Sequence, residues 1–87
     1  MEELNKIEVG KVSHYYGKIG VAVVDLTGEL KIGDEILIEG KDSKIKQKVT
    51  SMQIEHENVE KAVAGQSIGL KVDGKVKDGY KVYKIIG

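Results

Sequence analysis

The chain has 87 residues, of which 40% are hydrophobic and 32% are charged, and its fourteen lysines balance fourteen Asp and Glu residues. Because it has no cysteine, neither disulfides nor thiolate metal sites can supplement its small core. A net charge of zero without arginine gives no support to a general, charge-driven nucleic-acid binder, although a local basic stripe remains compatible with it.

The apolar stretches are too short to span a membrane, and the chain starts with acidic residues where a signal peptide would be basic. We therefore expect a cytoplasmic protein without membrane contact. Ile and Val together number 21 against five Leu, and eleven Gly occur without any Pro. Because β-branched residues suit strands and glycines suit turns, this composition predicts an all-β fold.

The first expected strand runs from residue 6 to 16. Its apolar alternation changes phase at Gly10-Lys11, which predicts a β-bulge. After a turn at Gly17-Lys18, the second strand covers residues 19–26 and is apolar on both faces. Such a strand is buried on both faces, or carries something against its outer side.

The next segments predict a short strand at residues 30–32, a tight reversal at Gly33-Asp34 and a strand at residues 35–39. After a polar loop, a strand is expected at residues 44–54, with a second bulge near Thr50-Ser51 where its alternation slips.

Residues 55–64 lack alternation and predict a loop with at most one helical turn. Residues 68–72 alternate again, and Asp73-Gly74 and the 77–79 segment signal turns before a closing strand at 80–86. Short strands with frequent turns and two bulges favour a barrel. We expect a small closed six-stranded antiparallel-type barrel with β-bulges, as a single domain at residues 6–87 after a frayed N-terminus at residues 1–5.

Four segments in order resemble domain 2 of elongation factor Tu and related translational GTPases, as a stand-alone domain. They are Gly28-Glu29-Leu30-Lys31-Ile32-Gly33-Asp34-Glu35-Ile36, Val49-Thr50-Ser51-Met52-Gln53-Ile54, Ala64-Gly65-Gln66-Ser67-Ile68-Gly69-Leu70 and Lys77-Asp78-Gly79-Tyr80-Lys81-Val82. The resemblance implies a translation-protein β-barrel. It does not imply GTP binding, because the chain has no phosphate-binding loop.

The family's pocket for the aminoacylated end of tRNA falls on Gln53, His56 and Ser67. These residues keep some polarity but not the family's charge pattern, so a conventional aminoacyl-tRNA role is not implied. Free-standing barrels, and similar barrels appended to the ends of certain peptidases, are a closer likeness.

No arrangement of residues predicts catalysis or a cofactor. The two histidines lie far apart in the sequence without a third ligand at metal-binding spacing, and no serine lies in a nucleophile elbow. We therefore expect a protein that is not an enzyme and that needs neither cofactor nor metal.

Two segments are candidates for binding. In the segment His14-Tyr15-Tyr16-Gly17-Lys18, alternation directs the two tyrosines to opposite faces, so one of them is free to stack on a nucleobase or to fill the core. Lys44, Lys46 and Lys48 share one strand face, which suits either phosphate tracking or the protection of an edge strand.

The resemblance makes a non-catalytic binding module for RNA or a ribonucleoprotein the first hypothesis. The alternative is an accessory module that docks onto a larger enzyme through exposed apolar residues such as Leu37 and Tyr15. The residues expected to contact RNA or a protein partner are His14, Tyr15, Lys18, Lys44, Lys46, Lys48 and His56.

Overall fold

The computed structural model describes residues 5–41 and 43–86, and every regular element within them is a β-strand. The strands are β1 (Lys6–Tyr16), β2 (Val21–Leu26), β3 (Leu30–Lys31), β4 (Glu35–Glu39), β5 (Lys44–Lys48), β6 (Met52–Ile54), β7 (Glu57–Val59), β8 (Lys61–Ala62), β9 (Ser67–Lys71) and β10 (Lys81–Ile85). In this part of the chain, no helix exists that could cross a membrane. The frayed terminus was predicted for residues 1–5, of which 1–4 lie outside the described residues.

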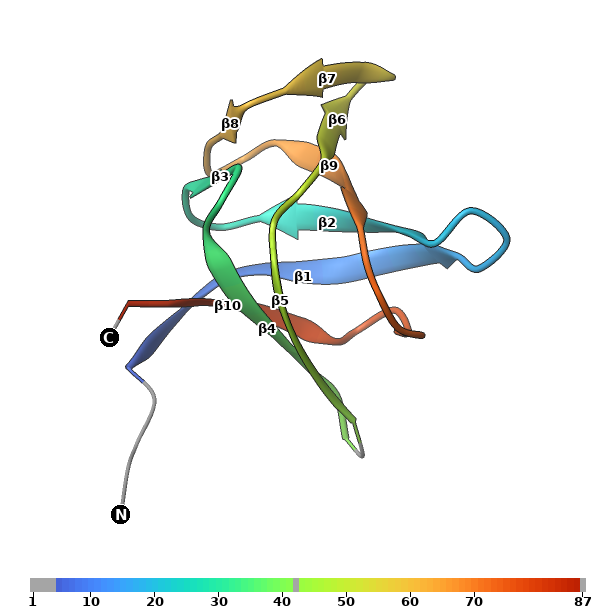
Figure 1. The fold of residues 1–87 in the computed structure, drawn as a ribbon, viewed down its shortest axis with the longest axis vertical. Helices are drawn as coiled ribbons and strands as arrows, with labels where there is room; N and C mark the ends of the chain where they lie inside the picture. The colour runs from blue at the N-terminus through green and yellow to red at the C-terminus, as the bar shows by residue number, and fades with distance from the viewer. Residues whose placement is uncertain (1–4, 42, 87) are drawn as a thin grey trace.

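Eight strands form one antiparallel sheet in the order β5-β4-β10-β1-β2-β9-β6-β7, and β3 pairs separately with β8 (Figure 1). The all-β prediction is confirmed. The predicted closed, six-stranded barrel is not confirmed, because the hydrogen-bonded order has two ends, β5 and β7.

The sheet curls around one hydrophobic core to which strands from both of its ends contribute. Alternation places Val12, Val24 and Ile38 on the inner side, where each is at most 1% exposed. Other fully buried side chains come from β3, β6 and β9, namely Leu30, Met52, Ile68 and Leu70. Since each buried aliphatic side chain contributes about 1.5–3 kcal/mol, this shared core holds the strands together without disulfides.

The bulge expected at Gly10-Lys11 is present one residue earlier, as a register shift of β1 against β10 between Glu8 and Gly10. Gly10 is needed there because a Cβ atom at this position would lie 2.6 Å from Cγ1 of Val24. A second shift between Val12 and His14, against β2, bends the strand further.

The single strand expected at residues 44–54 is interrupted. β5 ends at Lys48 and β6 begins at Met52, so the second slip in alternation marks a break and not a bulge. The physical reason is that the backbone N–H and C=O groups of Val49 form hydrogen bonds with the turn before β4. The N–H of Val49 donates to the carbonyl oxygen of Asp34, and its carbonyl oxygen accepts from the N–H of Gly33, both at 2.8 Å.

The prediction of a loop at residues 55–64 is wrong, because this segment contains β7 and β8. Ile54 pairs with Glu57 across a two-residue turn formed by Glu55 and His56. Both turn residues have positive φ angles, 52° and 67°, as in a type I′ turn. Asn and Gly normally occupy these positions, so the Glu-His sequence did not predict a hairpin turn.

Candidate functional site

A shallow hollow of about 300 Å³ lies on the outer side of the sheet, where the β1–β2 turn approaches the β6–β7 hairpin. Residues of four strands from distant parts of the sequence line it, together with residues of the two turns. Its lining residues are Tyr16, Ile19, Val21, Val23, Gln53, Glu55, His56, Ser67, Ile68 and Gly69.

The floor of this hollow is apolar because β2 is apolar on both faces. Ala22 and Val24 point into the core, so Val21 and Val23 point outward and are only half-buried. At its margin, Tyr16 is 50% exposed and Ile19, in the turn after β1, is 59% exposed. The sequence pattern predicts a strand that is buried or covered on its outer side, but within the described residues Val21 and Val23 remain only half-buried.

The rim of the hollow is polar. Gln53, His56 and Ser67, which the family resemblance places in one pocket, all line it. The Ser67 hydroxyl donates to Oδ1 of Asp25 at 2.6 Å, and Nε2 of Gln53 donates to Oδ1 of Asn58 at 3.1 Å. The rim therefore offers hydrogen-bonding groups that are already oriented by their neighbours.

The histidine-tyrosine segment divides between the two faces of β1, as alternation predicted. Tyr16 is the outward tyrosine, and the ring of His14 contacts it edge-on with 4.4 Å between ring centroids. Tyr15 points the other way and packs against the core. Lys18 is exposed in the turn that follows. The contact role predicted for Tyr15 therefore suits Tyr16 better.

The predicted basic stripe lies on β5, at one end of the sheet, and its lysines are exposed as expected. Two of them face carboxylates of β4: Nζ of Lys44 lies 3.3 Å from Glu39, and Nζ of Lys46 lies 3.9 Å from Glu35. Since these carboxylates offset the positive charge, the lysines are typical of an edge strand that must avoid pairing with a neighbour.

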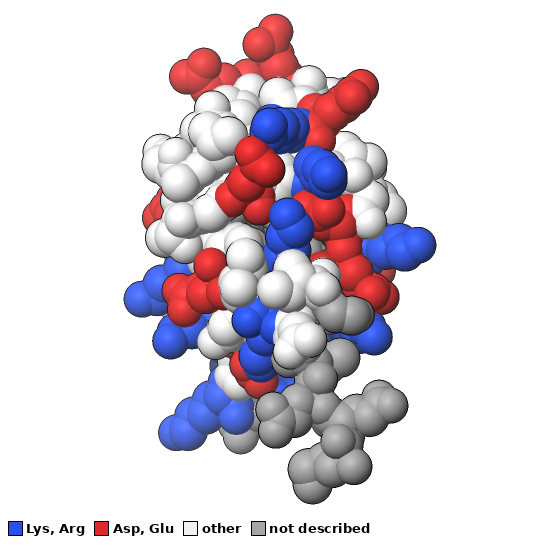
Figure 2. All heavy atoms as spheres, turned by 90° about the vertical axis from the view of Figure 1, so that its left-hand side faces the viewer, with Lys and Arg blue, Asp and Glu red and all other residues white. Residues whose placement is uncertain are grey.

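Glu39 also accepts from Nζ of Lys6 at 3.1 Å. This hydrogen bond is the main reason why the pKa of the Glu39 carboxyl lies below its ordinary value of 4.5, and Lys44 lowers it further. The hydrogen bond and charge of Lys61, at 3.1 Å, lower the pKa of Glu29 in the same way. Figure 2 shows lysines and carboxylates side by side, without a field of a single sign on this face.

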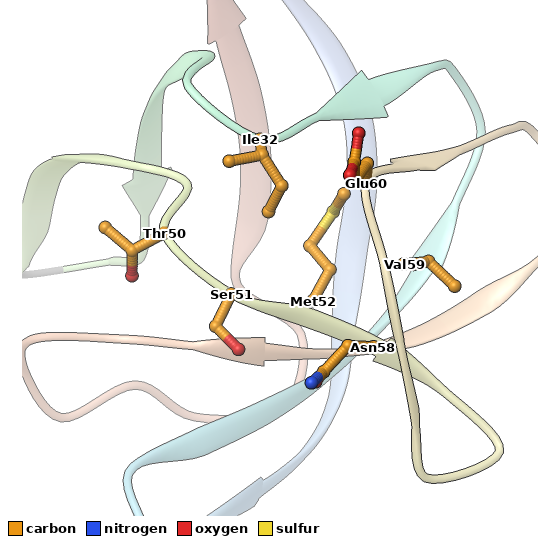
Figure 3. A pocket seen from close by; sticks show the side chains of 7 residues that line it. All are labelled: Ile32, Thr50, Ser51, Met52, Asn58, Val59 and Glu60. Carbon is orange, nitrogen blue, oxygen red and sulfur yellow. The ribbon is translucent and has the colours of Figure 1, made fainter.

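A second hollow, of about 320 Å³, opens beside the break between β5 and β6 (Figure 3). Glu60 is its one charged lining residue, and Ile32, Thr50, Ser51, Met52, Asn58 and Val59 complete it. No residue here forms a nucleophile–base pair. Among residues 5–41 and 43–86, no group of three or more His, Asp or Glu side chains could hold a metal ion.

The apolar contact predicted for Leu37 is wrong, because this side chain is only 6% exposed. Leu37 lies between Tyr83 of β10 and Lys46 of β5 in the sheet, and cross-strand neighbours on the same face cover one another. The exposed large apolar residues are instead Ile7, Tyr16, Ile19, Ile32, Val63 and Ile86. Of these, Tyr16 and Ile19 line the first hollow.

Residues 20–83 match the family model described as elongation factor Tu domain 2, and the chain therefore belongs to this domain family. Two particular relatives are described as a protease and a collagenase. The chain is 46% identical over 79 residues to an uncharacterised protease of Methanocaldococcus jannaschii, covering 90% of this chain and 19% of that protein. It is 44% identical over 81 residues to a collagenase of Porphyromonas gingivalis, covering 91% and 20%.

The fold is also that of a solved structure, the C-terminal domain of a candidate U32 peptidase from Geobacillus thermoleovorans. The TM-score is 0.82 at 22% identity, over 87% of this chain and 89% of that one. The chain thus spans about a fifth of the length of the curated relatives it matches.

These relatives overturn the first functional hypothesis. A translation-related module with RNA or a ribonucleoprotein as its partner is wrong, because the proteins similar to nearly the whole chain are described as proteases and collagenases. Lys44 and Lys46 of the predicted stripe lie beside carboxylates of β4. The alternative, an accessory module on a larger enzyme, fits the relatives better.

Proposed function

We propose that this chain is a non-catalytic accessory module that docks onto the catalytic part of a U32-type peptidase. The observation that carries this proposal is how much of this chain, and how much of each relative, the similarity covers. Identity of 44–46% extends over about nine-tenths of the chain but over only about a fifth of the protease relatives. Four-fifths of each relative therefore lies outside the similarity, which leaves room for a separate catalytic part.

The chemistry of the described residues supports a binding role. In the first hollow, Ser67 is bonded to the exposed carboxylate of Asp25, and among the described residues no serine is hydrogen-bonded to a histidine. Carboxylates such as Glu29 and Glu39 are paired with lysines at the surface. A common core shared by strands from both ends of the sheet supports the proposal that residues 6–87 act as one domain. Such a domain contributes a surface, and not reacting groups, to its partner.

A direct binding measurement tests this proposal. The purified chain is titrated calorimetrically with the intact U32-type peptidase of the same cell, and we expect saturable binding. The chain alone is expected to hydrolyse neither gelatin nor casein. Absence of binding, or hydrolysis by the chain alone that survives repeated purification, would overturn the proposed function.

A further inference from the structure

We propose that Asp73, in the segment between β9 and β10 (Figure 1), is a site of spontaneous modification at which aspartate isomerises to isoaspartate through a cyclic imide. The chain contains two Asp-Gly pairs, Asp73-Gly74 and Asp78-Gly79. In such pairs the imide forms most readily, because glycine has no side chain that hinders attack by its own backbone nitrogen. The surroundings of the two pairs differ, and only the first is open to the reaction.

The reaction requires only the chain itself and water. The backbone nitrogen of Gly74 attacks the side-chain carboxyl carbon of Asp73, a C–N bond forms, and the hydroxyl of the protonated carboxyl leaves as water with the hydrogen of the nitrogen. Water then opens the five-membered ring at either of its carbonyls. One cleavage regenerates aspartate, and the other gives isoaspartate, in which the main chain passes through the former side-chain carboxyl. The net change is an isomerisation without oxidation or reduction.

The first observation concerns the attacking nitrogen. A backbone N–H that donates a hydrogen bond must give up that bond before its nitrogen can turn toward a side chain. The N–H of Gly79 donates to the carbonyl oxygen of Val12 at 2.7 Å, so the second pair is held closed. By contrast, the N–H of Gly74 donates no hydrogen bond to any group in the described part of the chain.

The second observation concerns the carboxyl group that is attacked. Asp73 is exposed, and with the described residues its carboxyl forms neither a hydrogen bond nor an ion pair. Asp34, for comparison, accepts from the N–H of Lys31 at 3.0 Å and lies 3.5 Å from Nζ of Lys84. The carboxyl of Asp78 is as free as that of Asp73, so the hydrogen bond of the following nitrogen is what distinguishes the two Asp-Gly pairs.

The third observation is that the backbone is anchored on one side of the pair only. The N–H of Asp73 donates to Oε1 of Gln47 at 2.8 Å, and Nε2 of the same amide donates to the carbonyl oxygen of Lys71 at 2.9 Å. After this anchor, Gly74 lies in a bend, and residues 75–77 belong to no strand. The carboxyl is therefore held beside a peptide group that is free to rotate, and such proximity favours ring closure.

The modification has a structural consequence. Gly74 packs so closely on β5 that a Cβ atom at this position would lie 2.8 Å from Cδ1 of Ile45. Isoaspartate inserts one more carbon into the main chain between Asp73 and Gly74, while the amide of Gln47 still holds the preceding backbone. Gly74 then cannot keep its place on Ile45. The link between β5, at one end of the sheet, and the segment after β9 is loosened, so we expect the isomerised chain to be less stable.

The test measures isoaspartate at both pairs in one sample. The purified chain is kept for several weeks near neutral pH at physiological temperature, and peptide mapping with electron-transfer fragmentation locates the isomerised residue. We expect isoaspartate to accumulate at Asp73 at least fivefold faster than at Asp78. In urea that unfolds the chain, the hydrogen bond of Gly79 is lost, and the two rates should agree within twofold. Equal rates in the folded chain, or a difference that persists in urea, would overturn the proposal.

Two matched variants test the consequence. Asp73→Glu keeps the charge but blocks the reaction at this position, because a glutamate would have to close a six-membered ring, which forms far more slowly; Asp78→Glu makes the same change at the protected pair. After the same incubation, the wild-type chain and Asp78→Glu should unfold at a lower urea concentration than before, whereas Asp73→Glu should keep its midpoint. An equal loss in Asp73→Glu would refute the link between the modification and stability. These outcomes do not depend on the proposed function, since no peptidase takes part.

Discussion

The β6–β7 turn should be more stable with the residues that its geometry favours. Replacing Glu55 and His56 together by Asn and Gly keeps the two-residue turn and its positive φ angles, 52° and 67° in this structure, but supplies residues that adopt them at lower cost. Relief amounts to about 1–2 kcal/mol at a position that accepts Gly. Asn adds a smaller gain, and the greater freedom of Gly in the unfolded chain removes about 0.5–1 kcal/mol.

The net expectation is a gain of about 0.5–1.5 kcal/mol in the free energy of unfolding, or roughly 2–12 °C in Tm for a domain of this size. Urea unfolding followed by circular dichroism measures it. Glu57→Asn, at the first position of β7 beyond the turn, is the control and should change stability by less than about 0.5 kcal/mol. Unchanged stability would refute the argument from strain.

Three further substitutions test the fold. Gln47→Ala removes the buried amide that donates to the carbonyl oxygen of Lys71, at the end of β9, at 2.9 Å and accepts from the N–H of Asp73 at 2.8 Å. Urea unfolding should show a loss of about 1–3 kcal/mol; a loss below about 0.5 kcal/mol contradicts this. Gly40→Ala would place a Cβ atom 2.2 Å from the ring of Tyr80, so we expect a loss of about 1–3 kcal/mol and a shift of the Tyr80 ring signals in NMR spectra. Because the folded-state pKa of Glu39 lies below 4.5, its stabilising effect is complete above pH 4.5 and is lost as the pH falls through the folded-state pKa. Lys6→Gln should raise the midpoint of the Glu39 carboxyl in an NMR titration, and an unchanged midpoint would refute this pairing.

Local sequence patterns predicted the strands well where the core imposes alternation. The slip at Gly10-Lys11 identified the bulge in β1 because only a residue without a side chain fits against Val24. The break after Lys48 was read as a second bulge, because both events change the phase of alternation. Only the hydrogen bonds of Val49 to the turn before β4 distinguish them, and these join residues distant in sequence.

The burial of Leu37 and the carboxylates beside the β5 lysines have the same physical origin. Leu37 alternates with buried isoleucines and so should point outward, as it does, but Tyr83 and Lys46 on the flanking strands cover it. For Lys44 and Lys46, the opposing carboxylates come from the register of β4 against β5. Alternation within one strand does not reveal which strands lie beside it or in which register. The exposure of Leu37 and the net charge around the two lysines could therefore not be predicted.

The same reasoning explains why the hollow on the outer side of β2 was found only in three dimensions. Each contribution looks unremarkable by itself: an isoleucine in a turn, two valines in a strand and a Glu-His pair in a segment without alternation. The sheet order β1-β2-β9-β6 brings them to one place, and the type I′ turn directs Glu55 and His56 to its edge. The one sequence signal that pointed there was the apolar outer face of β2, since a strand inside a sheet that is apolar on both sides requires a cover. A partner that covers this face would contribute apolar surface to the floor of the hollow.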